Sequence, residues 1–170
     1  MRYRNYNNDI HPAIPYIALY DEDGTQVING SFLTWDSIKS KTSHFLYSAD
    51  DDRVQLQLNS SGLYEVTFNV SLAGSDTCYF ELYKNGTVIS ESRMFISPIM
   101  AGQTIYTQSG SIKYVVFLQK GDYIQVKGTG VIDGASTIAN TSRLIIKFLP
   151  MHGWDNSAGG RLDYKGGVER

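Results

Sequence analysis

The sequence predicts an all-β protein in which antiparallel strands form two facing sheets. Apolar and polar residues alternate in segment after segment between residues 16 and 149, the pattern of strands with one buried face. Turn-forming residues separate these segments, and no window of about 11 residues keeps the apolar period of a helix. Many short strands bury their apolar sides only when two sheets pack against each other.

The strands are bounded by recognisable turns. Asn85-Gly86 is a hairpin signal because both residues tolerate a positive φ angle. In the segment 53–58, alternation places Val54, Leu56 and Leu58 on one face. We expect strands over residues 16–20, 44–47, 53–58, 63–72, 78–83, 87–89, 112–118, 123–127 and 143–148.

The predicted core consists of the large apolar residues on the inward faces of these strands. These residues are Val54, Leu56, Tyr64, Val66, Phe68, Phe80, Leu82, Val116, Leu118, Ile124, Val126, Leu144, Ile146 and Phe148.

Composition divides the chain into three parts. Residues 1–15 form a polar arm rich in Tyr, Asn and Arg, residues 16–149 form the strand domain, and residues 150–170 form a Gly-rich tail. The net charge of −2 gives no basic face, so nucleic acid is not an expected partner. No apolar run approaches the roughly 20 residues that span a bilayer, and residues 1–6 lack the apolar stretch of a signal peptide. We therefore expect no membrane partner.

The sequence does not predict an enzyme. His11, His44 and His152 have no ligand-like spacing, and no nucleophile elbow or phosphate-binding loop is present. Cys78 is the only cysteine, so neither an intrachain disulfide nor a cysteine-based metal site is expected. We expect no cofactor; the alternative is Ca²⁺ at the acidic loops 21–24 and 50–52, whose carboxylates are the ligands that Ca²⁺ prefers.

Two strands carry apolar residues on both faces. If the inward set of residues 112–118 and 143–148 fills the core, Val115, Phe117 and Ile145 lie on the outer side. An exposed apolar patch of this kind usually marks an interface. The alternative is that tails or loops of the same chain cover it.

Four segments resemble, in order and spacing, motifs of the tumour necrosis factor superfamily and of the complement-type globular heads. Residues 62–66 (GLYEV) resemble a strand opening, residues 82–86 (LYKNG) a hairpin, residues 118–126 (LQKGDYIQV) a turn and strand, and residues 142–149 the closing strand. The resemblance extends over residues 16–149.

This resemblance implies a ten-stranded jelly roll that forms a homotrimer through one sheet. Charged residues at the edge of the contact would then pair between subunits and set their register. The trimer-facing residues that the resemblance implies are Glu65, Thr67, Lys113, Val115, Phe117, Arg143, Ile145 and Lys147.

Two functions follow as expectations. The first is a structural component of a virion, such as a minor capsid, decoration or fibre-head protein, whose arm and tail contact other particle proteins. The second is an extracellular trimeric recognition module that binds a receptor or glycan through its apical loops.

Overall fold

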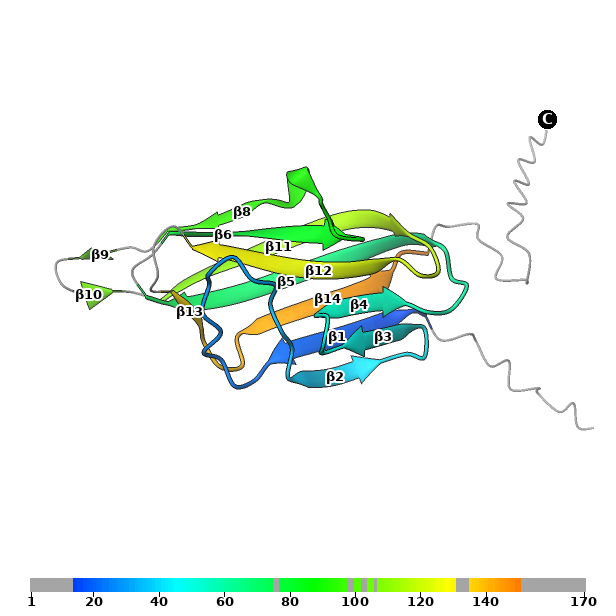
Figure 1. The fold of residues 1–170 in the computed structure, drawn as a ribbon, viewed down its shortest axis with the longest axis horizontal. Coiled ribbons are helices and arrows are strands. Elements are labelled where there is room, and N and C mark those ends of the chain that lie inside the picture. Colours follow the sequence, from blue (N-terminus) through cyan, green and yellow to red (C-terminus); the bar gives the residue numbers. More distant parts are fainter. Residues whose placement is uncertain are drawn as a thin grey trace, which may run out of the picture.

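The computed structural model describes residues 14–74, 77–97, 100–101, 104–105, 107–130 and 135–150. In this part of the chain two six-stranded antiparallel sheets pack as a sandwich, and a two-stranded hairpin extends from one end (Figure 1). The predicted all-β sandwich is therefore confirmed. The N-terminal arm and the C-terminal tail lie outside the described residues, except for residues 14–15 of the arm and residue 150 of the tail.

The first sheet, called the β5 sheet below, is built around its longest strand. That strand pairs with β11 along its length on one side and with β14 and β13 on the other. The order is β11 (Gln108–Leu118), β5 (Gly62–Ala73), β14 (Ser142–Phe148), β1 (Tyr16–Asp21) and β2 (Ser37–Lys41), with β13 (Ser136–Thr137) paired to β5.

The second sheet, called the β12 sheet below, faces the first. A single 3₁₀ turn, η1 (Ser90–Ser92), precedes its short edge strand β8, and the hairpin of β9 (Met100–Ala101) and β10 (Thr104–Ile105) follows. The order is β3 (Phe45–Ser48), β4 (Arg53–Leu56), β12 (Tyr123–Gly130), β6 (Cys78–Lys84) and β7 (Thr87–Val88), with β8 (Met94–Ile96) paired to β6.

The core lies between the two sheets, where alternate residues of each strand point inward. The predicted core residues are buried, except that Val116 and Phe148 are partly buried and pack against the others. Tyr64 is fully buried between the rings of Phe45 and Phe148, at centroid distances of 5.7 and 5.3 Å. Edge-on aromatic pairs of this kind contribute about 0.5–1.5 kcal/mol beyond their buried area.

The expectation for Leu58 is wrong. Strand β4 ends at Leu56, so the alternation does not continue to Leu58, whose side chain is 43% exposed. The chain turns there because the backbone N–H of Ser60 donates to the carbonyl of Leu58. The predicted strands are otherwise present, with ends shifted by a few residues, and β2, β8, β9, β10 and β13 were not predicted.

Candidate functional site

The outward face of β11, β5 and β14 brings the eight implied interface residues together. In the antiparallel register, Val115 lies opposite Glu65, which lies opposite Lys147. The next row joins Lys113, Thr67 and Ile145. Phe117 and Arg143 have the same parity on their strands, so all eight residues lie on the side of the β5 sheet that faces away from the core. This surface is called the β5 face below.

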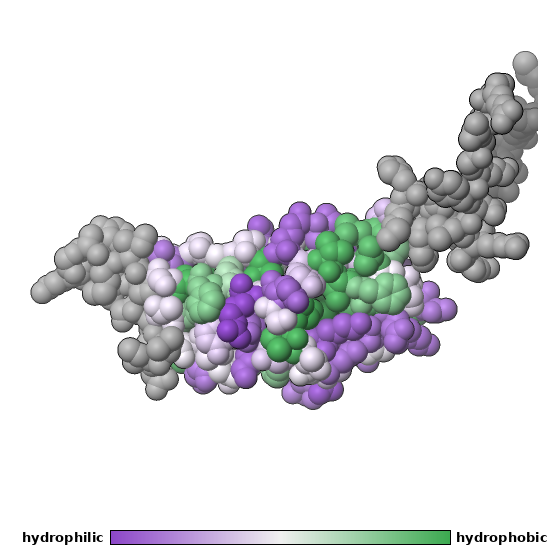
Figure 2. Space-filling model, turned by 90° about the horizontal axis from the view of Figure 1, so that it is seen from above, coloured by the Kyte–Doolittle hydropathy of each residue, from purple (hydrophilic) through white to green (hydrophobic). Residues whose placement is uncertain are grey.

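One end of the β5 face is apolar. Val115 is 47% exposed and Phe117 is 52% exposed, although both belong to a regular strand. Ile145 is half-buried. Figure 2 looks onto the edge of the sandwich from the side of β8. Hydrophobic surface gathers there toward the end of the sandwich at which β11 finishes.

Charge in the middle of the β5 face is paired within the chain. The Oε2 atom of Glu65 lies 3.0 Å from Lys113 Nζ, and its Oε1 atom lies 3.2 Å from Lys147 Nζ. The hydrogen bond from Lys113 is the largest influence, and with Lys147 it outweighs burial and holds the pKa of Glu65 below its ordinary value. The resemblance implied that these charges would pair between subunits. Because both lysines flank Glu65 on adjacent strands, they neutralise it before any second copy is present.

The other end of the β5 face is polar. Asn69 lies between Ser111 of β11 and Arg143 of β14. The Nδ2 atom of Asn69 is buried and has no hydrogen-bond partner among the described residues. Arg143 is exposed and makes no ion pair within the same part of the chain. Sequence reasoning named Arg143 but missed Asn69 and Ser111, because polar residues on an outward face carry no periodic signal.

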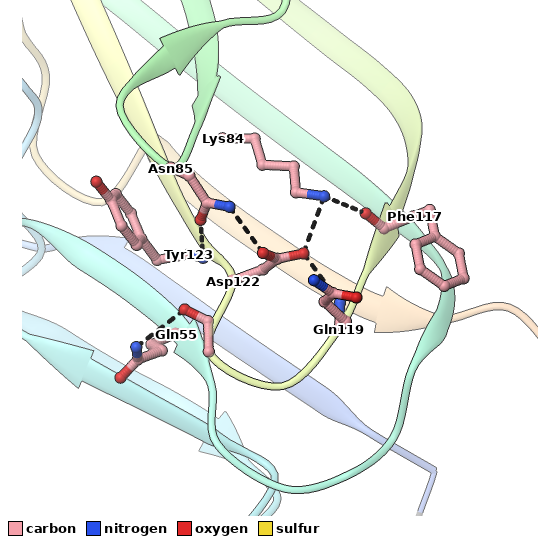
Figure 3. Close-up of polar contacts among 8 residues, drawn as sticks. Gln55, Lys84, Asn85, Phe117, Gln119, Asp122 and Tyr123 are labelled. Carbon is pink, nitrogen blue, oxygen red and sulfur yellow. Dashed lines mark hydrogen bonds and ion pairs between the residues drawn. The ribbon is translucent and has the colours of Figure 1, made fainter.

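A buried carboxylate joins the β6–β7 hairpin turn to the turn between β11 and β12, near the apolar end of the β5 face (Figure 3). Asp122 is 6% exposed and accepts from Asn85 Nδ2 at 2.7 Å and from the backbone N–H of Gln119 at 3.0 Å. Lys84 Nζ lies 2.9 Å from the Asp122 carboxylate and also donates to the carbonyl of Phe117. This network fixes the backbone that carries Phe117.

Electrostatics keep Asp122 ionised. Burial acts to raise its pKa, but the hydrogen bonds from Asn85, Lys84 and Gln119 and the charge of Lys84 outweigh burial. The pKa of Asp122 therefore lies below its ordinary value. The two sequence motifs LYKNG and LQKGD, which the resemblance rested on, meet at this carboxylate.

The backbone of the first acidic loop is held by two carboxylates, one from the loop itself and one from Asp36 just before β2. Asp36 accepts from the backbone N–H groups of Glu22 and Asp23, both at 2.8 Å, and Asp21 accepts from that of Gly24 at 2.9 Å. Within the described ranges, no group of three or more His, Cys, Asp or Glu side chains is arranged to hold a metal ion. His44 contacts Thr42, while His11 and His152 lie outside the described residues.

Two further observations bear on the class of protein. In the part of the chain that the structure describes, no helix has the length and hydrophobicity needed to cross a bilayer. Comparison of the sequence with protein-family models and with curated proteins finds no match to either.

Proposed function

We propose that this chain is a non-catalytic structural component of a virion that assembles as a homotrimer through the β5 face. The observation that carries the proposal is the exposure of Val115 and Phe117 on a regular strand, beside a carboxylate already neutralised within the chain. Burial of this face gains from the removal of apolar surface from water. Burial of a large apolar side chain contributes about 1.5–3 kcal/mol, and the gain is repeated in every copy.

The strand order supports a jelly roll of the tumour necrosis factor type. In a jelly roll the chain passes back and forth between two sheets. Here β4 and β6 belong to the β12 sheet, while β5 between them belongs to the β5 sheet. Strands β11 and β12 are also consecutive in the chain and lie in opposite sheets.

The path of the chain supports attachment to a larger particle. The backbone N–H of Phe148 donates to the carbonyl of Pro15 at 2.9 Å, so the arm and the tail begin side by side. Two polar segments that start at one end of a trimer are well placed to contact neighbouring particle proteins. On this proposal the chain resides in the virion.

A second candidate is an extracellular trimeric module that binds a receptor or glycan. The hairpin of β9 and β10 extends from the end of the sandwich opposite the start of β1 (Figure 1). That position is the one from which apical loops would reach a ligand.

Light scattering tests the assembly. At micromolar concentration the wild type is expected to have three times the 19.0 kDa mass of one chain. Phe117→Asp should reduce the mass to that of a single chain while the β-type circular dichroism is retained, because the new charge is desolvated only in the contact.

Phe95→Asp is the matched control. Phe95 is 64% exposed but lies on β8 of the other sheet, so this variant should keep the trimer mass. A wild-type chain that stays monomeric would contradict the proposed assembly. Peptide mapping of purified particles separates the two functions: the virion role requires this chain in the particle, and its presence only as a released trimer favours the recognition module.

A further inference from the structure

A row of hydrogen-bond donors crosses three adjacent strands at the polar end of the β5 face. Ser111 of β11 and Arg143 of β14 both lie directly opposite Asn69 of β5. Neighbouring strands are about 4.8 Å apart, so the three side chains span about 10 Å on one surface. The amide of Asn69 occupies the centre of this row.

The donors of this row have no acceptors among the described residues. Asn69 Nδ2 is shielded from solvent and makes no hydrogen bond there. Arg143 is exposed and forms no ion pair within the same residues, unlike Lys113 and Lys147, which share the carboxylate of Glu65. The Arg143 guanidinium and the Ser111 hydroxyl are open to an acceptor from outside the chain, and a rotation of the partly buried Asn69 side chain would bring its amide to the same acceptor.

The charge around the row is positive. Lys113, Lys147 and Arg143 contribute three positive charges to the β5 face, and Glu65 contributes one negative charge. Glu65 and its two lysines together carry one excess positive charge, and Arg143 adds a second that no carboxylate of this face offsets. A guanidinium group binds oxyanions through paired N–H donors, and such charge-assisted hydrogen bonds are stronger than neutral ones.

We propose that Arg143, Asn69 and Ser111 form a binding site for an oxyanion. The guanidinium supplies charge and two parallel donors, the Asn69 amide supplies the shielded donor, and the Ser111 hydroxyl completes the row. Two sources offer this chemistry: a free inorganic oxyanion such as sulfate, or a carboxylate of a second copy of the chain. The site itself does not require the trimer, although the second source does.

Titration with sodium sulfate at constant ionic strength, followed by NMR of the Asn69 side-chain amide, tests the site. The Phe117→Asp background keeps the β5 face free of a second copy. We expect a saturable shift of the Asn69 signal, weakened about tenfold or more by Arg143→Gln because the charge-assisted bonds are lost. Arg53→Gln removes an equal charge from β4 in the other sheet and should leave the titration unchanged.

A second measurement identifies the source of the oxyanion. It compares the self-association of Arg143→Gln and Arg53→Gln, each made in the otherwise wild-type chain. Saturable sulfate binding that depends on Arg143 identifies a free oxyanion. If sulfate does not bind, but Arg143→Gln weakens association and Arg53→Gln does not, the acceptor is a carboxylate of a second copy. If neither effect is found, the oxyanion site is wrong, even where a trimer forms. A monomeric wild type that binds sulfate through Arg143 would reject the proposed assembly and keep the site.

Discussion

The Nδ2 atom of Asn85 donates a 2.7 Å hydrogen bond to Oδ1 of Asp122, 37 positions away, and joins the β6–β7 hairpin turn to the turn that connects β11 with β12. A second bond, from the backbone N–H of Tyr123 to Asn85 Oδ1 at 2.9 Å, closes the contact (Figure 3). Both hydrogen-bonding groups of the Asn85 side chain are therefore used. The two turns behave as one unit.

Asp122→Ala is expected to lower the free energy of unfolding by about 2–4 kcal/mol, because it leaves the partners of a buried carboxylate unpaired. Urea denaturation followed by circular dichroism measures the change. Asp50→Ala, at an exposed loop position, is the control and should have little effect. A loss of less than about 0.5 kcal/mol in Asp122→Ala, the range of ordinary surface substitutions, would show that the network does not stabilise the fold.

The contribution of Asp122 should also depend on pH in a defined direction. Its pKa in the folded chain lies below the ordinary value of 3.8, since hydrogen bonds and Lys84 outweigh burial. The folded state therefore binds the proton less readily than the unfolded state. The stabilisation from Asp122 is complete when the pH is above the ordinary pKa, and it is lost as the pH falls through the pKa of the folded chain. The difference in unfolding free energy between wild type and Asp122→Ala should shrink as the pH is lowered from about 5 to about 2. If the difference in unfolding free energy stays constant over this pH range, the pKa of Asp122 is not lowered by folding.

Glu65→Gln is expected to weaken self-association with little effect on the stability of the single chain. The substitution leaves Lys113 and Lys147 without their shared counter-charge on the face that the proposed trimer buries. Light scattering over a dilution series measures association, and thermal unfolding measures stability. Glu22→Gln removes the carboxylate partner of Lys39 from an exposed pair elsewhere and serves as the control. Equal association of both variants and wild type would place Glu65 outside the contact.

Gly128→Ala is expected to destabilise the sandwich by about 1–3 kcal/mol through overpacking. A Cβ atom at this position would lie 2.7 Å from Phe80 Cε1 and 3.1 Å from Ile28 Cγ2, and both residues are buried. The thermal midpoint of unfolding measures the effect. Thr129→Ala, at the next and outward-facing position of β12, should change the midpoint much less. An unchanged midpoint in Gly128→Ala would mean that Phe80 can move aside.

Alternation predicted the fold wherever one face of a strand is buried and the other is not. Strand β5 shows the pattern along its whole length, and its predicted inward residues Tyr64, Val66 and Phe68 are fully buried. Strand β2 was missed because it lies at the sheet edge with almost every side chain exposed, so no alternation marks it. Strands β8 and β13 have three and two residues, too few to show a period.

The candidate site was predicted only in part. Parity along single strands placed Val115 and Phe117 outside the core, where the structure finds them half-exposed. Which residues meet across strands depends on register, and register between β11, β5 and β14 is set by packing of segments far apart in the chain. The bracketing of Glu65 by two lysines and the donor row around Asn69 therefore had no signal in the sequence.

The pairing of Tyr16 with Lys147 gives the sandwich nearly circular connectivity. Strand β1 starts where β14 ends, so a short linker between them would close the described fold into a ring without removing a strand from either sheet. The chain can then be opened at a surface turn instead, and the same two sheets are expected to form. Domains joined directly before Tyr16 and after Phe148 would begin as neighbours at one pole of the sandwich, which makes the described fold a suitable scaffold for displaying pairs of domains.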